Sequence, residues 1–176
     1  MMAIDLEIVG AKLLAAAPFR DSRGTFEVFW EKAELKAAGI SFAPVSSCHS
    51  YNQKAGILRG MHFQQAPHGQ TKLVSCVQGA AWDVIVDLRP DSPTYKRWHG
   101  ETLEAGSGRA IFIPAGCAHG FLTLKDETTI TYLIEGDYKP AAAGVVRWND
   151  PAFSIEWPMR DPILSERDRL ASDFIA

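Results

Sequence analysis

The 176-residue sequence has no apolar run long enough to form a membrane helix. Such a helix needs roughly 18 or more consecutive apolar residues, and the apolar stretch from Leu13 to Phe19 is far shorter. This stretch also lacks the basic leader and the small-residue cleavage site of a secretory signal peptide. The sequence therefore predicts a cytoplasmic protein without a membrane partner.

Cysteine and clustered positive charge are also scarce. The three cysteines, Cys48, Cys76 and Cys117, are an odd number without CxxC spacing, so we expect reduced thiols that pack rather than catalyse. The net charge is −3 and the chain has no basic run, whereas a general nucleic-acid binder shows a clustered positive face. We therefore expect no nucleic-acid partner, and any bound phosphate should be held by a few individually placed arginines and lysines.

The sequence does contain a succession of short β-type segments separated by turn residues. These segments are rich in valine, isoleucine, threonine and aromatic residues, and they span Ile57–Gln64, Lys72–Val77, Trp82–Leu88, Ala110–Pro114 and Thr128–Ile134. Helices are predicted only at Glu31–Ala38, which Gly39 ends, and in the C-terminal tail. The pattern predicts one all-β domain, residues 1–176, built as a sandwich or barrel.

Alternation within two of these strands predicts a ligand cavity. Lys72 lies on the same strand face as Val74 and Cys76, and Tyr132 lies on the same face as the isoleucines two positions before and after it. A lysine is unfavourable in a filled core, but it fits the wall of a cavity, which a small antiparallel barrel can enclose.

Arg59, His62 and His119 are the other polar residues that mark a site. Strict alternation points Arg59 and His62 to opposite faces of their strand, so both reach one cavity only if Gly60 forms a bulge or bend. His119 follows a turn at the entrance of another strand. Each residue taken singly also has an ordinary structural explanation: a strand histidine is commonly a hydrogen-bonded core residue, and an isolated lysine commonly extends its amine to solvent.

Several segments taken together resemble the dTDP-4-dehydrorhamnose 3,5-epimerase family. The order and spacing of these segments match from Asp21 to Asp168, which is nearly the whole chain. They are Leu58–Gln64, Gln70–Val74, Asp83–Arg89, Ser92–Thr94, Ile113–Phe121, Tyr138–Pro140 and Trp148–Pro151. The resemblance implies a cupin-type jelly-roll barrel with short peripheral helices, and an isomerase that needs no metal or other cofactor.

The resemblance also implies a substrate and a catalytic mechanism. The substrate would be a nucleotide-diphosphate-linked 4-keto-6-deoxysugar that is inverted at C3, C5 or both. The family's base aligns with His62, the carboxylate that orients it with Asp168, its acid with Tyr132 and the cation beside the enolate with Lys72. These roles are chemically complete, because removal and return of a proton beside a ketone need a base, an acid on the other face and a fixed positive charge. Asp168 also fits a capping box that starts at Ser165.

Five further residues align with the family's substrate-binding positions. They are Arg23, Phe26, Arg59, His119 and Tyr138. In the family, the segment that holds Arg23 and Phe26 reaches the site of the partner subunit, so the resemblance implies a homodimer.

Three departures from the family pattern affect substrate recognition. Val28 occupies the usual position of an acidic residue, and Ala141–Ala143 stand where a glutamate is common. The segment Ser46–Asn52, which contains Cys48, replaces a glutamine and an asparagine that help hold the nucleotide. These changes leave the identity of the nucleotide and of the sugar open.

Two alternatives remain at this stage. A metal-dependent cupin needs two closely spaced histidines with a carboxylate and a further histidine, but Gln64 stands where a second histidine would follow His62. A non-catalytic cupin that only binds a sugar nucleotide is the other alternative, although binding alone does not require an acid and a base.

Overall fold

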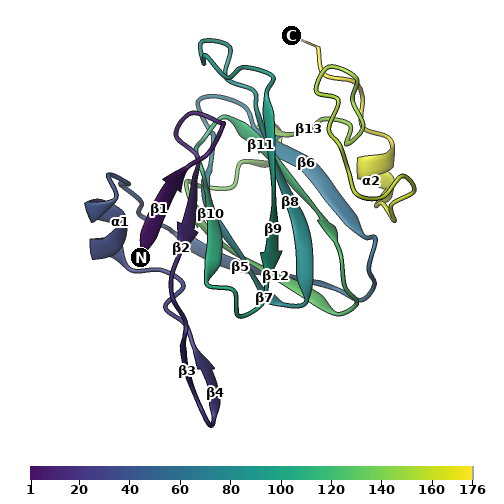
Figure 1. Cartoon of the computed structure of the whole chain (residues 1–176). Helices are drawn as coiled ribbons and strands as arrows, with labels where there is room; N and C mark the ends of the chain where they lie inside the picture. The colour runs from purple at the N-terminus through teal and green to yellow at the C-terminus, as the bar shows by residue number, and fades with distance from the viewer. Residues whose placement is uncertain (176) are drawn as a thin grey trace.

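A computed structural model describes residues 1–175 of the chain. Two antiparallel sheets pack face to face with the core between them (Figure 1). The first sheet has six strands in the order β1-β2-β10-β7-β12-β5, and the second has five in the order β13-β6-β11-β8-β9. This arrangement confirms the predicted cupin-type all-β fold.

The strands of the six-stranded sheet are β1 (Met2–Asp5), β2 (Lys12–Ala15), β10 (Arg109–Ile113), β7 (Thr71–Gln78), β12 (Thr128–Glu135) and β5 (Ser46–Asn52). Those of the five-stranded sheet are β13 (Ala143–Val145), β6 (Leu58–Gln64), β11 (Cys117–Thr123), β8 (Ala80–Asp87) and β9 (Trp98–Glu104). The remaining elements are the hairpin strands β3 (Phe19–Asp21) and β4 (Gly24–Phe26), the helices α1 (Lys32–Ala37) and α2 (Glu166–Arg169), and the 3-10 turn η1 (Pro140–Ala142).

The core between the sheets follows from the alternation of apolar residues. Val74 and Cys76 of β7 pack with Ile130 of β12 and with inward residues of the facing strands, such as Ile85 and Phe121. Toward one end of these same strands, the inward positions change from apolar to polar side chains, including Lys72. The predicted cavity therefore lies at one end of the sandwich, and the apolar core fills the rest of its interior.

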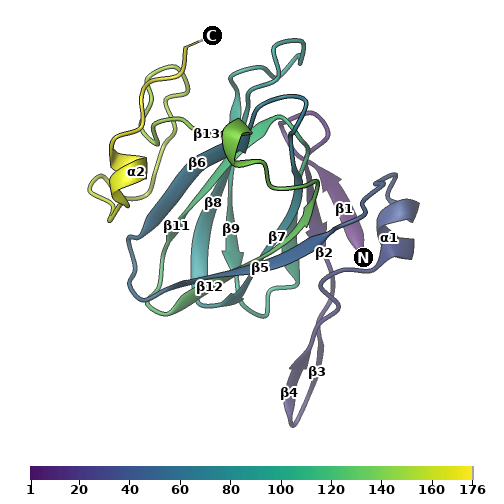
Figure 2. The ribbon, with the colours of Figure 1, turned by 180° about the vertical axis from the view of Figure 1, so that it is seen from behind.

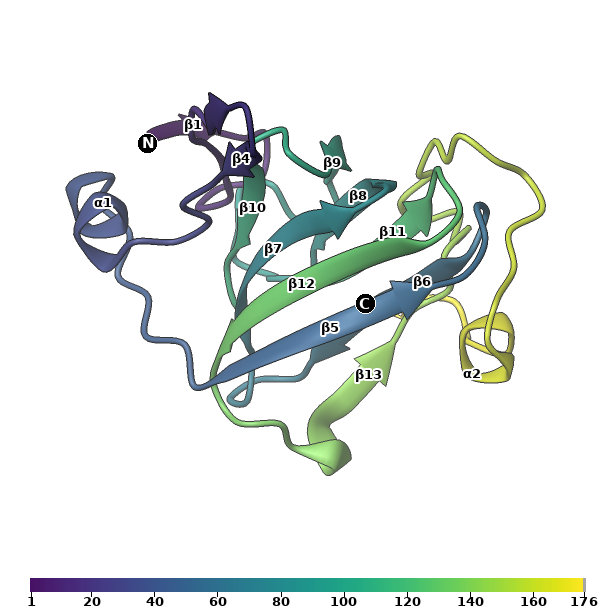
Figure 3. The ribbon, with the colours of Figure 1, turned by 90° about the horizontal axis from the view of Figure 1, so that it is seen from below.

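Each outer face of the sandwich is partly covered by peripheral chain. Helix α1 packs Leu35 on the six-stranded sheet, beside Phe112 and Leu73. The segment after β13 covers the five-stranded sheet with Phe153 and Phe174. It includes α2, which lies beside β6 (Figure 2). Seen from below, α1 and α2 lie on opposite sides of the two sheets (Figure 3). No helix in the described part of the chain is long and apolar enough to cross a membrane.

The five predicted strands and the predicted first helix are all present, with ends within two residues of those expected. Polar edge strands were missed by the sequence analysis. Strand β5 (SSCHSYN) lies at the edge of its sheet with most of its side chains exposed, so it has no apolar alternation. Strand β9 is an edge strand as well. Pairing with a buried neighbour, rather than the composition of the strand itself, holds each of them in place.

The prediction of packed thiols is confirmed for two cysteines and wrong for the third. Cys76 and Cys117 are buried, and burial raises the pKa of Cys76 to about 11 and that of Cys117 to about 12, so both are inert thiols at neutral pH. Cys48 is exposed on edge strand β5. All three are free.

Candidate active site

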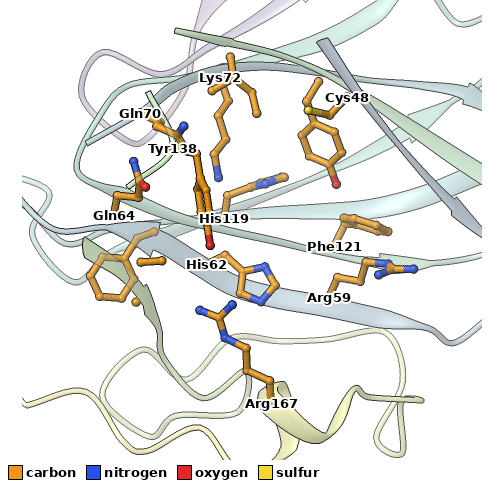
Figure 4. Close-up of a pocket in the computed structure, with 15 residues that line it drawn as sticks. Cys48, Arg59, His62, Gln64, Gln70, Lys72, His119, Phe121, Tyr138 and Arg167 are labelled. Atoms are coloured by element: carbon orange, nitrogen blue, oxygen red, sulfur yellow. The ribbon is translucent and has the colours of Figure 1, made fainter. Parts of the chain in front are cut away.

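A pocket with a volume of about 280 Å³ opens between the two sheets (Figure 4). Strands β6 and β11 supply one wall, strands β5, β7 and β12 supply the facing wall, and Tyr138 and Arg167 lie at the mouth. The lining residues are Cys48, Arg59, His62, Phe63, Gln64, Gln70, Lys72, His119, Phe121, Tyr132, Ile134, Tyr138, Ala143, Gly144 and Arg167. None of these described lining residues is acidic, whereas three are arginine or lysine, so the pocket suits an anionic ligand.

The bulge predicted at Gly60 is present, and it brings Arg59 and His62 to the same pocket. In the pairing of β11 with β6, His119 faces His62 and Phe121 faces Arg59, so two residues of β6, Gly60 and Met61, oppose the single residue Gly120 of β11. Gly60 has φ +138°, and a Cβ atom there would lie 2.5 Å from the Cα of Gly120. Only glycine fits this position, because an L side chain would be both strained and in collision.

Replacing Gly60 by alanine is expected to lower the free energy of unfolding by about 2–4 kcal/mol, from backbone strain and overpacking together. Gly106→Ala is the matched control, because Gly106 also has a positive φ but no atom within 4 Å of the added Cβ; it should cost only about 1 kcal/mol. Chemical denaturation of both variants measures the difference. Equal losses would show that the contact with Gly120 does not matter.

His62 and Asp168 form a hydrogen-bonded pair on the β6 wall. His62 Nε2 lies 2.7 Å from Asp168 Oδ1; the aspartate side chain is 4% exposed and the histidine side chain 40%. Burial works to raise the pKa of Asp168, but hydrogen bonds from His62, from Ser165 and from the backbone outweigh it and lower the pKa. The ionised aspartate therefore holds the proton of His62 on Nε2 and leaves Nδ1 as the basic nitrogen.

The local sequence explains how α2 delivers Asp168. The Ser165 side chain accepts a hydrogen bond from the Asp168 backbone N–H and caps the short helix. One half of the predicted capping box is thus present. The same helix carries Arg167, whose guanidinium lies on the His62 side of the pocket (Figure 4).

A second histidine–aspartate pair lies deeper, between β11 and β8. His119 Nε2 is 2.8 Å from Asp83 Oδ2, and both side chains are almost fully buried. His119 is the direct cross-strand neighbour of His62, so the two histidines stand side by side on one wall. Asp83 Oδ1 is buried and has no hydrogen-bond partner among the described residues.

Lys72 and Tyr132 occupy the facing wall. Burial lowers the pKa of Lys72 to about 8, although the negative charge of Asp83 acts in the opposite direction. Burial also raises the pKa of Tyr132 well above its ordinary value, and the charge of Asp83 adds to this effect. The phenol therefore stays protonated at neutral pH. Its ring packs edge-on against the His119 ring, with 5.9 Å between centroids.

The predicted binding residues are only partly gathered in this pocket. Arg59 lines it and donates from Nε to Asn52 Oδ1 at 2.7 Å. Tyr138 lines it with 63% of its surface exposed. Arg23 and Phe26 lie elsewhere, on the β3–β4 hairpin that projects from the body of the molecule (Figure 1). Arg23 Nη2 is 2.6 Å from Asp21 Oδ2, and Phe26 is 69% exposed.

Several residues of the pocket were not assigned to the site from the sequence, and three of them, Asp83, Arg167 and Cys48, carry titratable groups. Asp83 could have been recognised as the one acidic residue within the apolar run Ala80–Val86. Arg167 directly precedes Asp168 in α2, so the helix that places Asp168 beside His62 also places Arg167 at the pocket. No local sequence pattern marks Cys48 as a site residue, and it reaches the pocket because β5 pairs Cys48 with Tyr132.

Two of the departures from the family pattern, Cys48 and Ala143, lie on the pocket wall, whereas Val28 does not line it.

The arrangement supports proton transfer at carbon. A basic nitrogen and a protonated phenol reach the same pocket from facing sheets, so a ligand between them would meet a base on one side and an acid on the other. A lysine stands beside them to stabilise negative charge. Within residues 1–175, no group of three histidine, cysteine, aspartate or glutamate residues is placed to hold a metal ion.

Comparison with known proteins gives a consistent picture. The sequence profile described as dTDP-4-dehydrorhamnose 3,5-epimerase matches residues 5–175. The dTDP-4-dehydrorhamnose 3,5-epimerase of Shigella flexneri is 39% identical, over 99% of this chain and 97% of that protein. The crystal structure of the Bacillus anthracis enzyme with TDP and PPi bound has a TM-score of 0.95 at 42% identity, covering 98% of this chain and 99% of that one. A 3'-monoepimerase from Streptomyces bikiniensis in complex with dTDP-quinovose has a TM-score of 0.89 at 34% identity, covering 97% and 86%.

Proposed function

Because the chain belongs to the dTDP-4-dehydrorhamnose 3,5-epimerase family, it is an isomerase that epimerises a nucleotide-linked 4-keto-6-deoxysugar, and we propose that His62 and Tyr132 carry out the inversion. One observation supports this assignment above the others: the two side chains enter one pocket from opposite sheets. Inversion requires a proton to leave one face of a carbon and return to the other, and this placement meets that requirement.

In the proposed mechanism, His62 Nδ1 removes the proton from the carbon beside the ketone. Asp168 fixes the tautomer of His62 and stabilises the imidazolium that forms. The electron pair moves onto the C4 oxygen, and the ammonium group of Lys72 stabilises the resulting enolate. Tyr132 then donates its phenolic proton to the opposite face of the same carbon, and solvent restores both residues to their starting protonation states.

The substrate is proposed to be dTDP-4-dehydro-6-deoxyglucose, converted to dTDP-4-dehydrorhamnose. The relative from Bacillus anthracis was solved with TDP and PPi bound, and in this chain Arg59 and Arg167 supply positive charge at the pocket for a diphosphate. His119 and Tyr138 are proposed to contact the sugar or the nucleotide. The three free thiols fit a reducing compartment and support a cytoplasmic location.

Product analysis tests this function directly. The purified protein is incubated with dTDP-4-dehydro-6-deoxyglucose, and NMR coupling patterns report the configuration at C3 and C5. Inversion at both carbons supports a 3,5-epimerase, and inversion at one supports a narrower epimerase. dTDP-glucose, which lacks the ketone, is the control and should remain unchanged. Tight binding of the ketosugar without any inversion would support the binding-only alternative.

A homodimer is also proposed, in which the hairpin of one subunit completes the site of the other. Arg23 is 86% exposed at its side chain and Phe26 is 69% exposed, yet neither lines the pocket of its own chain. An arginine and an aromatic ring at the tip of a projecting hairpin suit a diphosphate and a base or sugar face on a neighbouring subunit. Two such exchanges related by a two-fold axis give a closed dimer.

Mixed dimers test the exchange. Arg23→Ala is expected mainly to raise KM, because a diphosphate contact acts alike in ground and transition states, whereas His62→Ala should abolish turnover. In a dimer with one subunit of each kind, one site has both His62 and the partner's Arg23 intact. Doubly tagged mixed dimers should therefore regain about half of the wild-type activity. Activity no higher than that of Arg23→Ala alone would contradict hairpin exchange.

A further inference from the structure

Asp83 is a buried charge that the proposed mechanism does not use. It lies in β8 with no exposed surface, on the same strand face as the buried core residues Ala81 and Ile85. Its Oδ2 accepts a hydrogen bond from His119, but its Oδ1 has no partner among the described residues. A buried carboxylate with only one of its oxygens satisfied is costly, so its presence points to a compensating interaction with another charged group.

Lys72 is the cation on the facing sheet that can compensate for Asp83. The two residues lie on strands of facing sheets, β7 and β8, and Lys72 lines the same pocket as His119, whose ring is hydrogen-bonded to Asp83. Burial lowers the pKa of Lys72, and the negative charge of Asp83 opposes this effect. Cys117 of β11 also lies near Lys72, but burial keeps it a neutral thiol. Tyr132 of β12 is neutral as well.

The other titratable or charged groups that line the pocket with Lys72 are Cys48 of β5, His62 and Arg59 of β6, His119 of β11, Tyr138 at the mouth and Arg167 of α2. None of these is a carboxylate, and the two arginines disfavour a further cation nearby. Asp83 is therefore the one carboxylate among these described groups, and its negative charge opposes both the effect of burial on Lys72 and the repulsion from the arginines.

We propose that Asp83 is a positioning residue that keeps Lys72 in its charged ammonium form, so that the enolate oxygen meets a cation. This inference rests on the proposed function, in which Lys72 stabilises the enolate. The hydrogen bond to Asp83 also holds the proton of His119 on Nε2, which fixes the orientation of that ring beside Lys72. One buried carboxylate thus acts on both His119 and Lys72.

The proposal predicts a specific pH dependence. Burial lowers the pKa of Lys72 to about 8 and the charge of Asp83 raises it, so removing that charge must lower the pKa further. Lysine that loses its proton no longer stabilises an enolate, and kcat therefore falls as pH rises through this pKa. Without the charge of Asp83, the same fall should occur at a lower pH, by about one unit.

The experiment compares Asp83→Asn with wild type in pH profiles of kcat. The asparagine keeps the shape of the side chain and can still accept a hydrogen bond from His119, so mainly the charge is lost. Asp87→Asn is the matched control: it removes a buried carboxylate from the same strand, one that Arg89 and Thr94 bind away from the pocket. We expect the alkaline limb to move down by about one unit in Asp83→Asn and to stay in place in Asp87→Asn.

Lys72→Arg tests whether Lys72 is the group whose loss of a proton causes kcat to fall at alkaline pH, because arginine keeps its charge throughout the pH range measured. The limb should disappear in that variant, and its persistence would show that a group other than Lys72 produces it. An unshifted limb in folded Asp83→Asn would overturn the proposal.

A second measurement uses the wild-type protein and does not depend on any variant at Asp83. NMR of the protein with ¹³C-labelled lysine, with Lys72 assigned by its absence in Lys72→Arg, gives the pKa of Lys72 directly. A Lys72 that is charged at neutral pH supports the proposal, and a neutral one overturns it even if Asp83→Asn fails to fold. This titration needs no substrate, so failure of the proposed function, seen as a wild-type protein that does not invert the ketosugar, would be distinguished from failure of this inference.

Discussion

His62→Ala is expected to lower the rate of proton removal from the substrate by about 10²–10⁴-fold, the usual contribution of a general base. The loss should fall on kcat, because His62 is proposed to act on the reacting carbon rather than on the nucleotide. Its side chain is 40% exposed in the pocket wall, so its removal leaves no large cavity in the core. Solvent deuterium exchange into the ketosugar measures the rate.

His49→Ala is the matched control for this variant. His49 is also a strand histidine and is hydrogen-bonded through Nδ1 to Thr131, but it does not line the pocket. Its replacement should leave exchange near the wild-type rate. Substrate binding by His62→Ala, measured by calorimetry, should stay within a few-fold of wild type. Near-normal exchange in His62→Ala would remove His62 from the role of base.

Tyr132→Phe is expected to separate two steps that normally occur together. The base is intact, so proton removal and its reversal should continue and exchange the substrate's proton with solvent from one face. Inversion should fall by about 10²–10⁴-fold, because no acid stands on the other face. The measured quantity is the ratio of inverted product to deuterated substrate, which should drop sharply.

The packing around Tyr132 makes this substitution informative. The ring keeps its edge-on contact with His119, and only the hydroxyl is lost. Burial raises the pKa of that hydroxyl, so it is a proton donor across the pH range in which the enzyme would work. Tyr51→Phe, on the exposed edge strand β5, controls for loss of a surface hydroxyl. Equal inversion by Tyr132→Phe and wild type would show that another group returns the proton.

The sequence predicted those parts of the fold that are built from apolar alternation. Strands β6, β7, β8, β10 and β12 bury at least one face, so their valines and isoleucines reveal them. Strands β5 and β9 are polar edges, and their position depends on hydrogen bonds to a neighbour that a local pattern does not encode. The strands with which β5 and β9 pair could be known only from the assembled sheets.

For the site, the sequence predicted the groups on the pocket walls better than those beneath them. Lys72 stood out because a lysine shares a strand face with apolar residues, and Gly60 because Arg59 and His62 needed a bulge to share a cavity. The structure shows that bulge. Asp83 was missed because its partners, His119 and Lys72, come from other strands, so its importance depends on contacts across the sandwich.

The role of the β3–β4 hairpin is a part of the site that the sequence of one chain does not determine. Arg23 and Phe26 were placed in the site by resemblance, and the structure of one chain leaves them outside the pocket. The sequence of a single chain does not state which surface of a second copy it will meet. Mixed dimers, as described above, are the way to place these two residues.

Deuterium labelling of the ketosugar by the wild-type protein shows whether a base in the pocket removes a proton from the substrate. The protein is incubated in D₂O with dTDP-4-dehydro-6-deoxyglucose, and NMR and mass spectrometry follow deuterium at each carbon. We expect solvent deuterium at C3, C5 or both, and inverted configuration at each carbon whose proton Tyr132 returns. Binding of the ketosugar with no deuterium at either carbon would contradict the proposed mechanism, because His62 would then not act as a base on this substrate.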